Sequence, residues 1–188
     1  MKSDLKHIFV YGGAFDPPHI GHTMVVSYLL SLDAGAEVWV IPTYNHAHSK
    51  KMADFNLRMQ WIRQAMSIFS DRVKVSSWEM HHQPPNTLTL IKQLQFGAPV
   101  DMTLVVGADN YRDRDKWHKW DELAELVDVL VIGRGGTRVN GFAIPEVSST
   151  QIRDAVREGN LTYLKHLLHA DVFQSLMECG ADLHGQSD

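Results

Sequence analysis

Two histidines lie three residues apart in a segment rich in glycine and proline, Gly12-Gly13-Ala14-Phe15-Asp16-Pro17-Pro18-His19-Ile20-Gly21-His22. This spacing places both imidazoles on one face at the entrance of a helix, with Gly21 leaving room between them. The free N–H groups of a helix N-terminus attract phosphate, and the paired glycines allow close approach of the backbone to a ligand. The segment therefore predicts a phosphate site, because two unrelated polar histidines would explain less of the pattern.

A second polar cluster follows much later, at Ser148-Ser149-Thr150-Gln151-Ile152-Arg153. Hydroxyl groups just before a helix supply an N-cap, and Arg153 adds a fixed cation beside the free N–H groups. Taken alone, the cluster is more simply interpreted as a helix cap. Its combination of hydroxyls, N–H groups and a cation also suits phosphate.

Short apolar runs bounded by turn signals alternate with longer helix-like stretches, which predicts βαβ units and a mainly parallel α/β sheet. We expect strands at 7–11, 37–41, 73–75, 102–107 and 129–132, helices at 20–32, 55–69, 87–96 and 117–126, and a helical C-terminal part over 150–180. Turn signals cover 81–85, and 43–53 is expected to be a loop. Ligands of such sheets bind beyond the carboxyl ends of the strands, where the first motif begins.

Composition limits the class of protein. The 188 residues, 44% of them hydrophobic, fit one domain over 1–188, and the single cysteine, Cys179, permits no intramolecular disulfide. The N-terminus leads directly into a strand without a signal-like apolar region, and no apolar run approaches the length of a membrane span. A net charge of −4 argues against a nucleic-acid surface. We expect a cytoplasmic protein that binds neither nucleic acid nor membrane.

The first motif resembles the signature of the HxGH nucleotidylyltransferases, a strand followed by Gly-x-Phe-Asp-Pro-x-His-x-Gly-His. The resemblance implies a Rossmann-like sheet with helices on both faces, a Mg²⁺-bound ATP, and in-line attack of an acceptor phosphate on the α-phosphorus with release of pyrophosphate. It implies that His19 and His22 contact the ATP phosphates and stabilise the transition state. The ATP cradle would comprise Gly12, Gly13, Ala14, Phe15, Asp16 and Gly21. Ala14 departs from the hydroxyl residue of many relatives.

The second cluster resembles the family's Ser-Ser/Thr-x-x-Arg element. The resemblance implies that Ser148, Ser149, Thr150 and Arg153 grip the outer phosphates, with Arg153 counted among the catalytic residues. Arg134, in Gly133-Arg134-Gly135-Gly136, lies where relatives place a basic residue near ATP. A plain loop after an edge strand is the simpler interpretation of those glycines.

The middle of the chain resembles bacterial nicotinate-nucleotide adenylyltransferases, through Gly107-Ala108-Asp109 followed by Trp117 and Trp120. The resemblance implies that Gly107 and Asp109 help to bind the nucleotides and that Trp117 stacks on a pyridine ring, for which a flat aromatic is suited. Alternatively, Trp117 and Trp120 anchor a helix in the core.

The acceptor side departs from that subfamily. In the loop after the second strand His48 matches, but His46 and Ala47 replace two prolines and the cation is displaced to Lys50. Pro85-Asn86-Thr87 keeps only the threonine. The candidate acceptor residues are Tyr44, His48, Lys50, Thr87 and Trp117, and backbone N–H groups near Tyr44-Asn45 or Pro85-Asn86-Thr87 are candidate donors to a ring carboxylate. Arg58 matches a family arginine, although composition alone suggests a solvated charge. A zinc site is a less favoured interpretation of four further histidines, because their spacing follows no helix pair and no cysteine joins them: His46, His48, His81 and His82.

These observations favour adenylyl transfer from ATP to nicotinate mononucleotide. Nicotinamide mononucleotide and phosphopantetheine remain alternative acceptors, and a cytidylyltransferase is less favoured because its arginine-threonine signature is missing. A nucleotide sensor without turnover is the non-enzymatic alternative, disfavoured by the retention of His19, His22 and Arg153. The oligomeric state is open.

Overall fold

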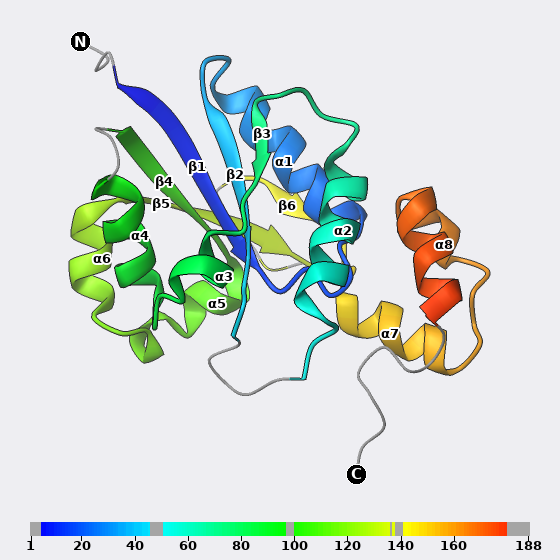
Figure 1. Cartoon of the computed structure of the whole chain (residues 1–188). Helices are drawn as coiled ribbons and strands as arrows, with labels where there is room; N and C mark the ends of the chain where they lie inside the picture. Colours follow the sequence, from blue (N-terminus) through cyan, green and yellow to red (C-terminus); the bar gives the residue numbers. More distant parts are fainter. Residues whose placement is uncertain (1–4, 46–50, 97–99, 136, 138–140, 180–188) are drawn as a thin grey trace.

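The computed structural model describes residues 5–45, 51–96, 100–135, 137 and 141–179. Within these residues, six parallel strands form one sheet in the order β3-β2-β1-β4-β5-β6 (Figure 1). They are β1 (Lys6–Gly13), β2 (Glu37–Pro42), β3 (Val73–Val75), β4 (Val100–Gly107), β5 (Asp128–Arg134) and β6 (Ala143–Ile144). The expected parallel sheet is thereby confirmed.

The strand order reverses between β1 and β4. From β1 the chain first builds outward through β2 and β3, then returns to the other side of β1 with β4 and continues to β5 and β6. Tyr11 on β1 consequently lies opposite Val40 of β2 and Val105 of β4. A crevice for ligands forms at such a switch point, outside the carboxyl ends of the strands. The first motif leaves β1 at this point.

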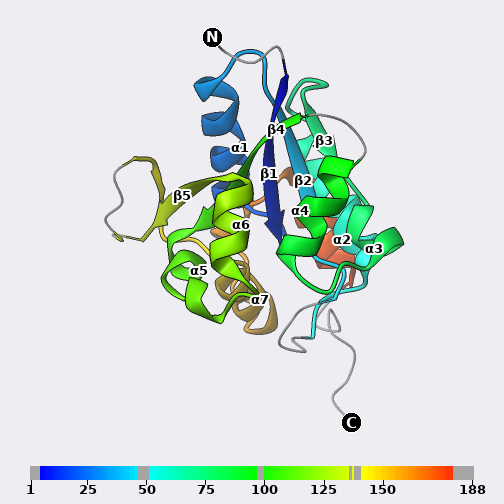
Figure 2. The ribbon, with the colours of Figure 1, turned by 90° about the vertical axis from the view of Figure 1, so that its left-hand side faces the viewer.

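Helices cover both faces of the sheet, as expected (Figure 2). The helices α1 (Ile20–Leu32) and α2 (Phe55–Met66) bury one face together with Phe9 of β1. The helices α4 (Thr87–Phe96) and α6 (Trp120–Leu126) bury the other face together with Ile8 and Val10. Successive side chains of a strand point to opposite faces, so this apolar run supplies both cores.

The C-terminal part is helical in three pieces, as expected: α7 (Ser149–Arg157), the 3-10 turn η2 (Leu164–His166) and α8 (Ala170–Cys179). It packs on α2 through a third core that includes Trp61, Ile152 and Leu176. The indole Nε1 of Trp61 donates a 2.8 Å hydrogen bond to Ser175 Oγ. Among the residues that the structure describes, no helix has the length and apolar character needed to cross a membrane.

The structure corrects several expected elements. A short helix, α3 (Trp78–His82), begins before the expected turn and ends where Gln83 adopts a left-handed conformation. The expected helix at 117–126 is shorter, because left-handed Lys119 and extended Trp117 lie outside a helix. Preceding it are α5 (Ala108–Arg112) and the 3-10 turn η1 (Arg114–Lys116). The strand β6 adds only two residues, too few to produce a recognisable alternation.

Candidate active site

The segment after β1 turns sharply before α1 begins. Phe15 adopts a left-handed backbone conformation, with φ of 48°, and its buried ring packs against Tyr11 and His22. A Cβ at position 13 would lie 3.2 Å from that ring, a tight contact, so glycine lets the ring fold back on the strand without displacement. Asp16 and His19 are also buried, although both are polar.

The two histidines form the N-terminal cap of α1. His19 Nδ1 accepts a 3.1 Å hydrogen bond from the Gly21 N–H, and His22 Nδ1 accepts a 3.0 Å hydrogen bond from the His19 N–H. Because each Nδ1 is an acceptor, the proton of each neutral ring lies on Nε2. The ring centroids are 3.9 Å apart, so the predicted pairing of the imidazoles is present. Their contact with phosphate remains a prediction.

Both rings are held neutral. Burial, reinforced by the charge of Arg134, lowers the pKa of His19 to about 4. Burial, the neighbouring His19 and Arg134 lower the pKa of His22 well below its ordinary value. Neutral rings with Nε2–H groups are hydrogen-bond donors at neutral pH. Donors of this kind can stabilise the negative charge of an anionic ligand without exchanging a proton with it.

The second cluster packs directly on the first motif. Ser148 Oγ accepts a 3.1 Å hydrogen bond from the Gln151 N–H, which confirms the helix cap. Ser149 Oγ donates to the Pro17 carbonyl at 2.9 Å. Arg153 is 6% exposed; it donates to the Asp16 carbonyl at 2.6 Å and to Thr150 Oγ1 at 3.1 Å. The structure thus unites the two motifs, with the arginine directed at the loop. Contact of Arg153 with the outer phosphates remains a prediction.

Gly21 leaves room for the His19 ring, as the sequence suggested, and has a second role in packing. It is buried, and a Cβ there would come within 2.9 Å of Ile144 Cδ1 and Val147 Cγ1. The space beside it is therefore occupied by β6 and by the residues that lead into α7. A Cβ would also lie 3.0 Å from His19 Cε1, so glycine at this position leaves room for the His19 ring and permits the close packing of the residues that lead into α7.

A cation lies beside the histidine pair. Arg134 ends β5, and its NH1 is 3.5 Å from Asp109 Oδ2 in a partly exposed ion pair. Gly107 precedes that aspartate, and a Cβ there would lie 2.6 Å from Asp109 Oδ1. The expectation that an edge strand precedes Arg134 is wrong, because β5 pairs with β4 and β6. The charge of Arg134 acts on both histidines, and its contact with ATP remains a prediction.

Of the candidate acceptor residues, Tyr44 follows the end of β2 and Thr87 is the first residue of α4. His48 and Lys50 lie outside the described residues. The Tyr44 N–H donates to Glu79 Oε2 at 2.9 Å, so this N–H is not available to a ring carboxylate as suggested. Glu79 belongs to α3, which the sequence analysis missed. Burial raises the pKa of its carboxyl group.

The ring of Trp117 meets the ring of Trp120 edge-on, with centroids 5.6 Å apart. Both side chains are half-buried against the core between the sheet and the helices α4 and α6. Both tryptophans therefore pack against the core, as the alternative interpretation of them expected. Stacking of Trp117 on a pyridine ring remains a prediction.

Arg58 is the clearest residue that composition misjudged. It is 1% exposed rather than solvated. Its Nε donates to the Ala53 carbonyl at 2.9 Å, and its NH1 donates to the Ala14 carbonyl at 2.8 Å. The match to a family arginine was the only signal in the sequence that set it apart from a surface charge.

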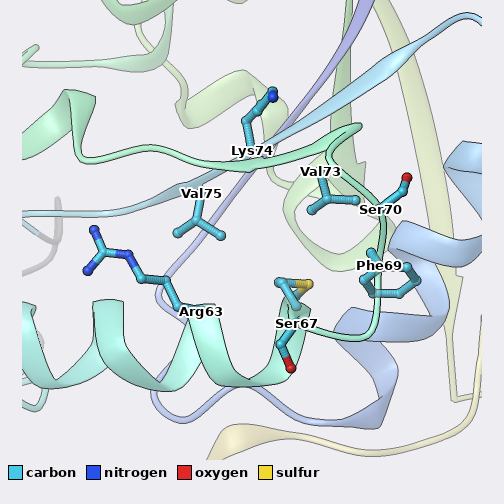
Figure 3. A pocket seen from close by; sticks show the side chains of 8 residues that line it. Arg63, Ser67, Phe69, Ser70, Val73, Lys74 and Val75 are labelled. Atoms are coloured by element: carbon cyan, nitrogen blue, oxygen red, sulfur yellow. The ribbon is translucent and has the colours of Figure 1, made fainter.

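A hollow of about 330 Å³ lies elsewhere, between the C-terminal end of α2 and the strand β3 (Figure 3). Arg63, Phe69 and Lys74 are among its lining residues, and none of the predicted site residues lines it. The hollow is therefore separate from the predicted site.

Sequence and structure comparisons define the class. Residues 10–155 match the family model described as cytidylyltransferase-like. A curated relative from Anaeromyxobacter dehalogenans (strain 2CP-C), named probable nicotinate-nucleotide adenylyltransferase, is 32% identical over 82% of this chain and 86% of its own. A relative of the same name from Sulfurimonas denitrificans is 33% identical over 82% and 87% of the respective chains.

A solved structure of similar fold is that of Plasmodium falciparum nicotinic acid mononucleotide adenylyltransferase complexed with NaAD. It superimposes with a TM-score of 0.82 at 20% identity, covering 95% of this chain and 98% of that one. The chain belongs to the cytidylyltransferase-like family and, within it, to the nicotinate-nucleotide adenylyltransferases.

Proposed function

We propose that the protein transfers AMP from ATP to the 5′-phosphate of nicotinate mononucleotide, forming the dinucleotide precursor of NAD and releasing pyrophosphate. Relatives that carry this activity in their names are more than 30% identical over most of both chains. The structural observation that carries the proposal is the pair of neutral imidazoles at the N-terminus of α1, each with a proton on Nε2.

The geometry suits a displacement at phosphorus that needs no covalent intermediate. The acceptor phosphate is already an anion, so no general base is required to generate the nucleophile. His19 and His22 donate to the phosphoryl oxygens as charge develops, and the N–H groups at the start of α1 add to this field. Arg134 supplies positive charge beside both imidazoles, and Asp109 orients its guanidinium in the absence of ligand.

Mg²⁺ would enter with ATP. This ion prefers phosphate oxygens and water, with one or two carboxylates at most. In the described part of the chain, no group of three or more histidine, cysteine or acidic side chains is placed to hold a metal, which suits an ion held mainly by the nucleotide. Asp109, which forms an ion pair with Arg134, is the candidate carboxylate to face the ion. Bound Mg²⁺ would neutralise charge on the phosphates.

The proposed acceptor side comprises Tyr44, Thr87 and Trp117, with His48 and Lys50 in the adjoining segment. Trp117 would offer an aromatic face to the pyridine ring. Preference for the acid over the amide requires donors to the ring carboxylate, since stacking alone discriminates weakly whereas dedicated polar contacts reach several powers of ten.

The test is to incubate the purified protein with MgATP and, separately, nicotinate mononucleotide, nicotinamide mononucleotide or phosphopantetheine, with CTP replacing ATP in a parallel series. Pyrophosphate is measured and the product is identified. Selective turnover of phosphopantetheine, or use of CTP in place of ATP, overturns the proposal. Equal rates with both pyridine nucleotides overturn only the acid preference, and binding of ATP without turnover favours a sensor.

A further inference from the structure

Arg58 lies in the first turn of α2, inside the protein, and its guanidinium group binds the phosphate loop, Gly13 to Asp16. NH1 donates to the Ala14 carbonyl at 2.8 Å, and Nε donates to the Ala53 carbonyl at 2.9 Å. A buried charge is costly unless it is paired and hydrogen-bonded. Burial lowers the pKa of Arg58, while the charges of Asp16, Asp54 and Glu79 oppose that shift. An arginine so enclosed has a defined geometry.

The contact with Ala14 fixes the direction of one peptide group. In a trans peptide unit the carbonyl and the following N–H point in opposite directions. Because Arg58 holds the Ala14 carbonyl toward the interior, the Phe15 N–H points to the opposite side of the loop. Phe15 itself has a left-handed backbone conformation, which is unfavourable for a residue with a side chain and persists only when its surroundings hold it.

The same arginine adjoins the acceptor-side segment, of which the structure describes residues 43–45 and 51–54. The Thr43 N–H donates to the Gly13 carbonyl at 2.9 Å, and the Ala53 N–H donates to Asp16 Oδ1 at 3.3 Å. Both ends of the segment are therefore hydrogen-bonded to the phosphate loop. The Arg58 bond to the Ala53 carbonyl adds a third connection at the C-terminal end.

Aromatic contacts continue this connection toward Tyr44. The Arg58 guanidinium lies 5.3 Å from the centroid of the Phe55 ring, and that ring meets the Tyr44 ring edge-on at 5.2 Å. The Tyr44 backbone is held in turn by Glu79. One buried cation thus contacts the phosphate loop, the Ala53 carbonyl and the Phe55 ring, which in turn contacts Tyr44.

We infer that Arg58 is a positioning residue for the reaction: it orients the Ala14–Phe15 peptide so that the Phe15 N–H faces the nucleotide phosphates, and it fixes Ala53, at the end of the acceptor-side segment, against that loop. The inference rests on the proposed function, because it assumes that the loop binds ATP. Lysine in place of Arg58 keeps the charge but cannot donate from two nitrogens in the fixed geometry of a guanidinium.

The experiment compares Arg58→Lys and Arg58→Met with Arg63→Lys and Arg63→Met. Arg63 lies on the same helix but is exposed and borders the hollow of Figure 3, so it is a matched control. Thermal melting and circular dichroism establish folding, calorimetry gives the Kd of MgATP, and steady-state kinetics give kcat and both KM values. A displacement of reacting groups by about 1 Å costs on the order of a hundredfold in rate.

We expect folded Arg58→Lys to lose about a hundredfold in kcat and to bind MgATP roughly tenfold more weakly, while the Arg63 variants behave as the wild type. A merely structural role would lower the melting temperature and the active fraction but leave the Kd and both KM values unchanged, and that result overturns the inference. If the wild type binds MgATP but adenylylates no acceptor, the proposed function fails, and the MgATP affinities still decide the role of Arg58.

If the Arg58 variants fail to fold, a measurement on the wild-type protein still tests the inference. With ¹⁵N-labelled protein, the Phe15 amide resonance is followed during titration with MgATP. We expect a shift that saturates with nucleotide. An unchanged Phe15 amide at saturating MgATP overturns the proposed orientation.

Discussion

Arg153 donates a 2.6 Å hydrogen bond to the main-chain carbonyl of Asp16, and its NH1 lies 3.8 Å from the carboxylate of the same residue. This contact joins the first motif to a helix that begins more than 130 positions later in the chain. It also means that both conspicuous motifs form one structural unit. Substitution of the arginine therefore tests folding and function together.

Arg153→Met should lower the free energy of unfolding by about 2 kcal/mol, because the substitution removes a buried, charge-assisted hydrogen bond to the Asp16 carbonyl. We expect kcat to fall and the KM for ATP to rise, because the Asp16 carbonyl loses this donor. Urea denaturation and steady-state kinetics measure the two effects. Arg157→Met, on the exposed side of the same helix, is the control. Unchanged stability with only a raised KM for ATP would instead assign Arg153 to direct phosphate contact.

His22→Ala should reduce kcat by about a hundredfold or more, since one positioned donor to developing charge contributes roughly 3 kcal/mol to the transition state. The KM for ATP should change less, because the loss concerns charge that develops during the reaction. His82→Ala serves as the control: this exposed ring stacks on Trp78. Wild-type turnover by folded His22→Ala would remove the imidazole from the mechanism.

Stability should fall with acidification between pH 6.5 and about 4. The folded-state pKa of His19 is about 4, below the ordinary value of 6.5 expected in the unfolded chain. The unfolded state therefore binds more protons in this window, so the contribution of His19 is fully present above pH 6.5 and is lost as the pH falls toward 4. The size of this contribution is about 3 kcal/mol.

His19→Asn provides the comparison for that pH dependence, because asparagine is a favourable N-cap that does not titrate. Urea midpoints measured from pH 7 to pH 4 should decline less steeply for the variant than for the wild type. Identical slopes would show that the imidazole titrates normally in the folded protein, contrary to its burial.

Local sequence determined the parallel α/β architecture and the identity of the first motif. The run Ile8-Phe9-Val10 is apolar on both sides, as a central strand covered by helices requires, and α1 and α4 begin and end where their patterns predicted. The cap at Ser148 was also evident, because capping depends on residues only three positions apart.

Tertiary structure decided the roles of residues whose partners are remote in the chain. Arg58 and Arg63 are both arginines on α2, yet one is buried against the Ala14 carbonyl and the other is exposed. The sequence suggested that Gly21 leaves room beside the histidines, and folding adds Ile144 and Val147 as close neighbours of the same glycine. Glu79 could be singled out only once its hydrogen bond from the Tyr44 N–H was seen. Arg134 could be connected with the histidines only once its charge was found to lower the pKa of His19. Hydrogen bonds and burial depend on distances that only folding creates, so no local pattern encodes these assignments.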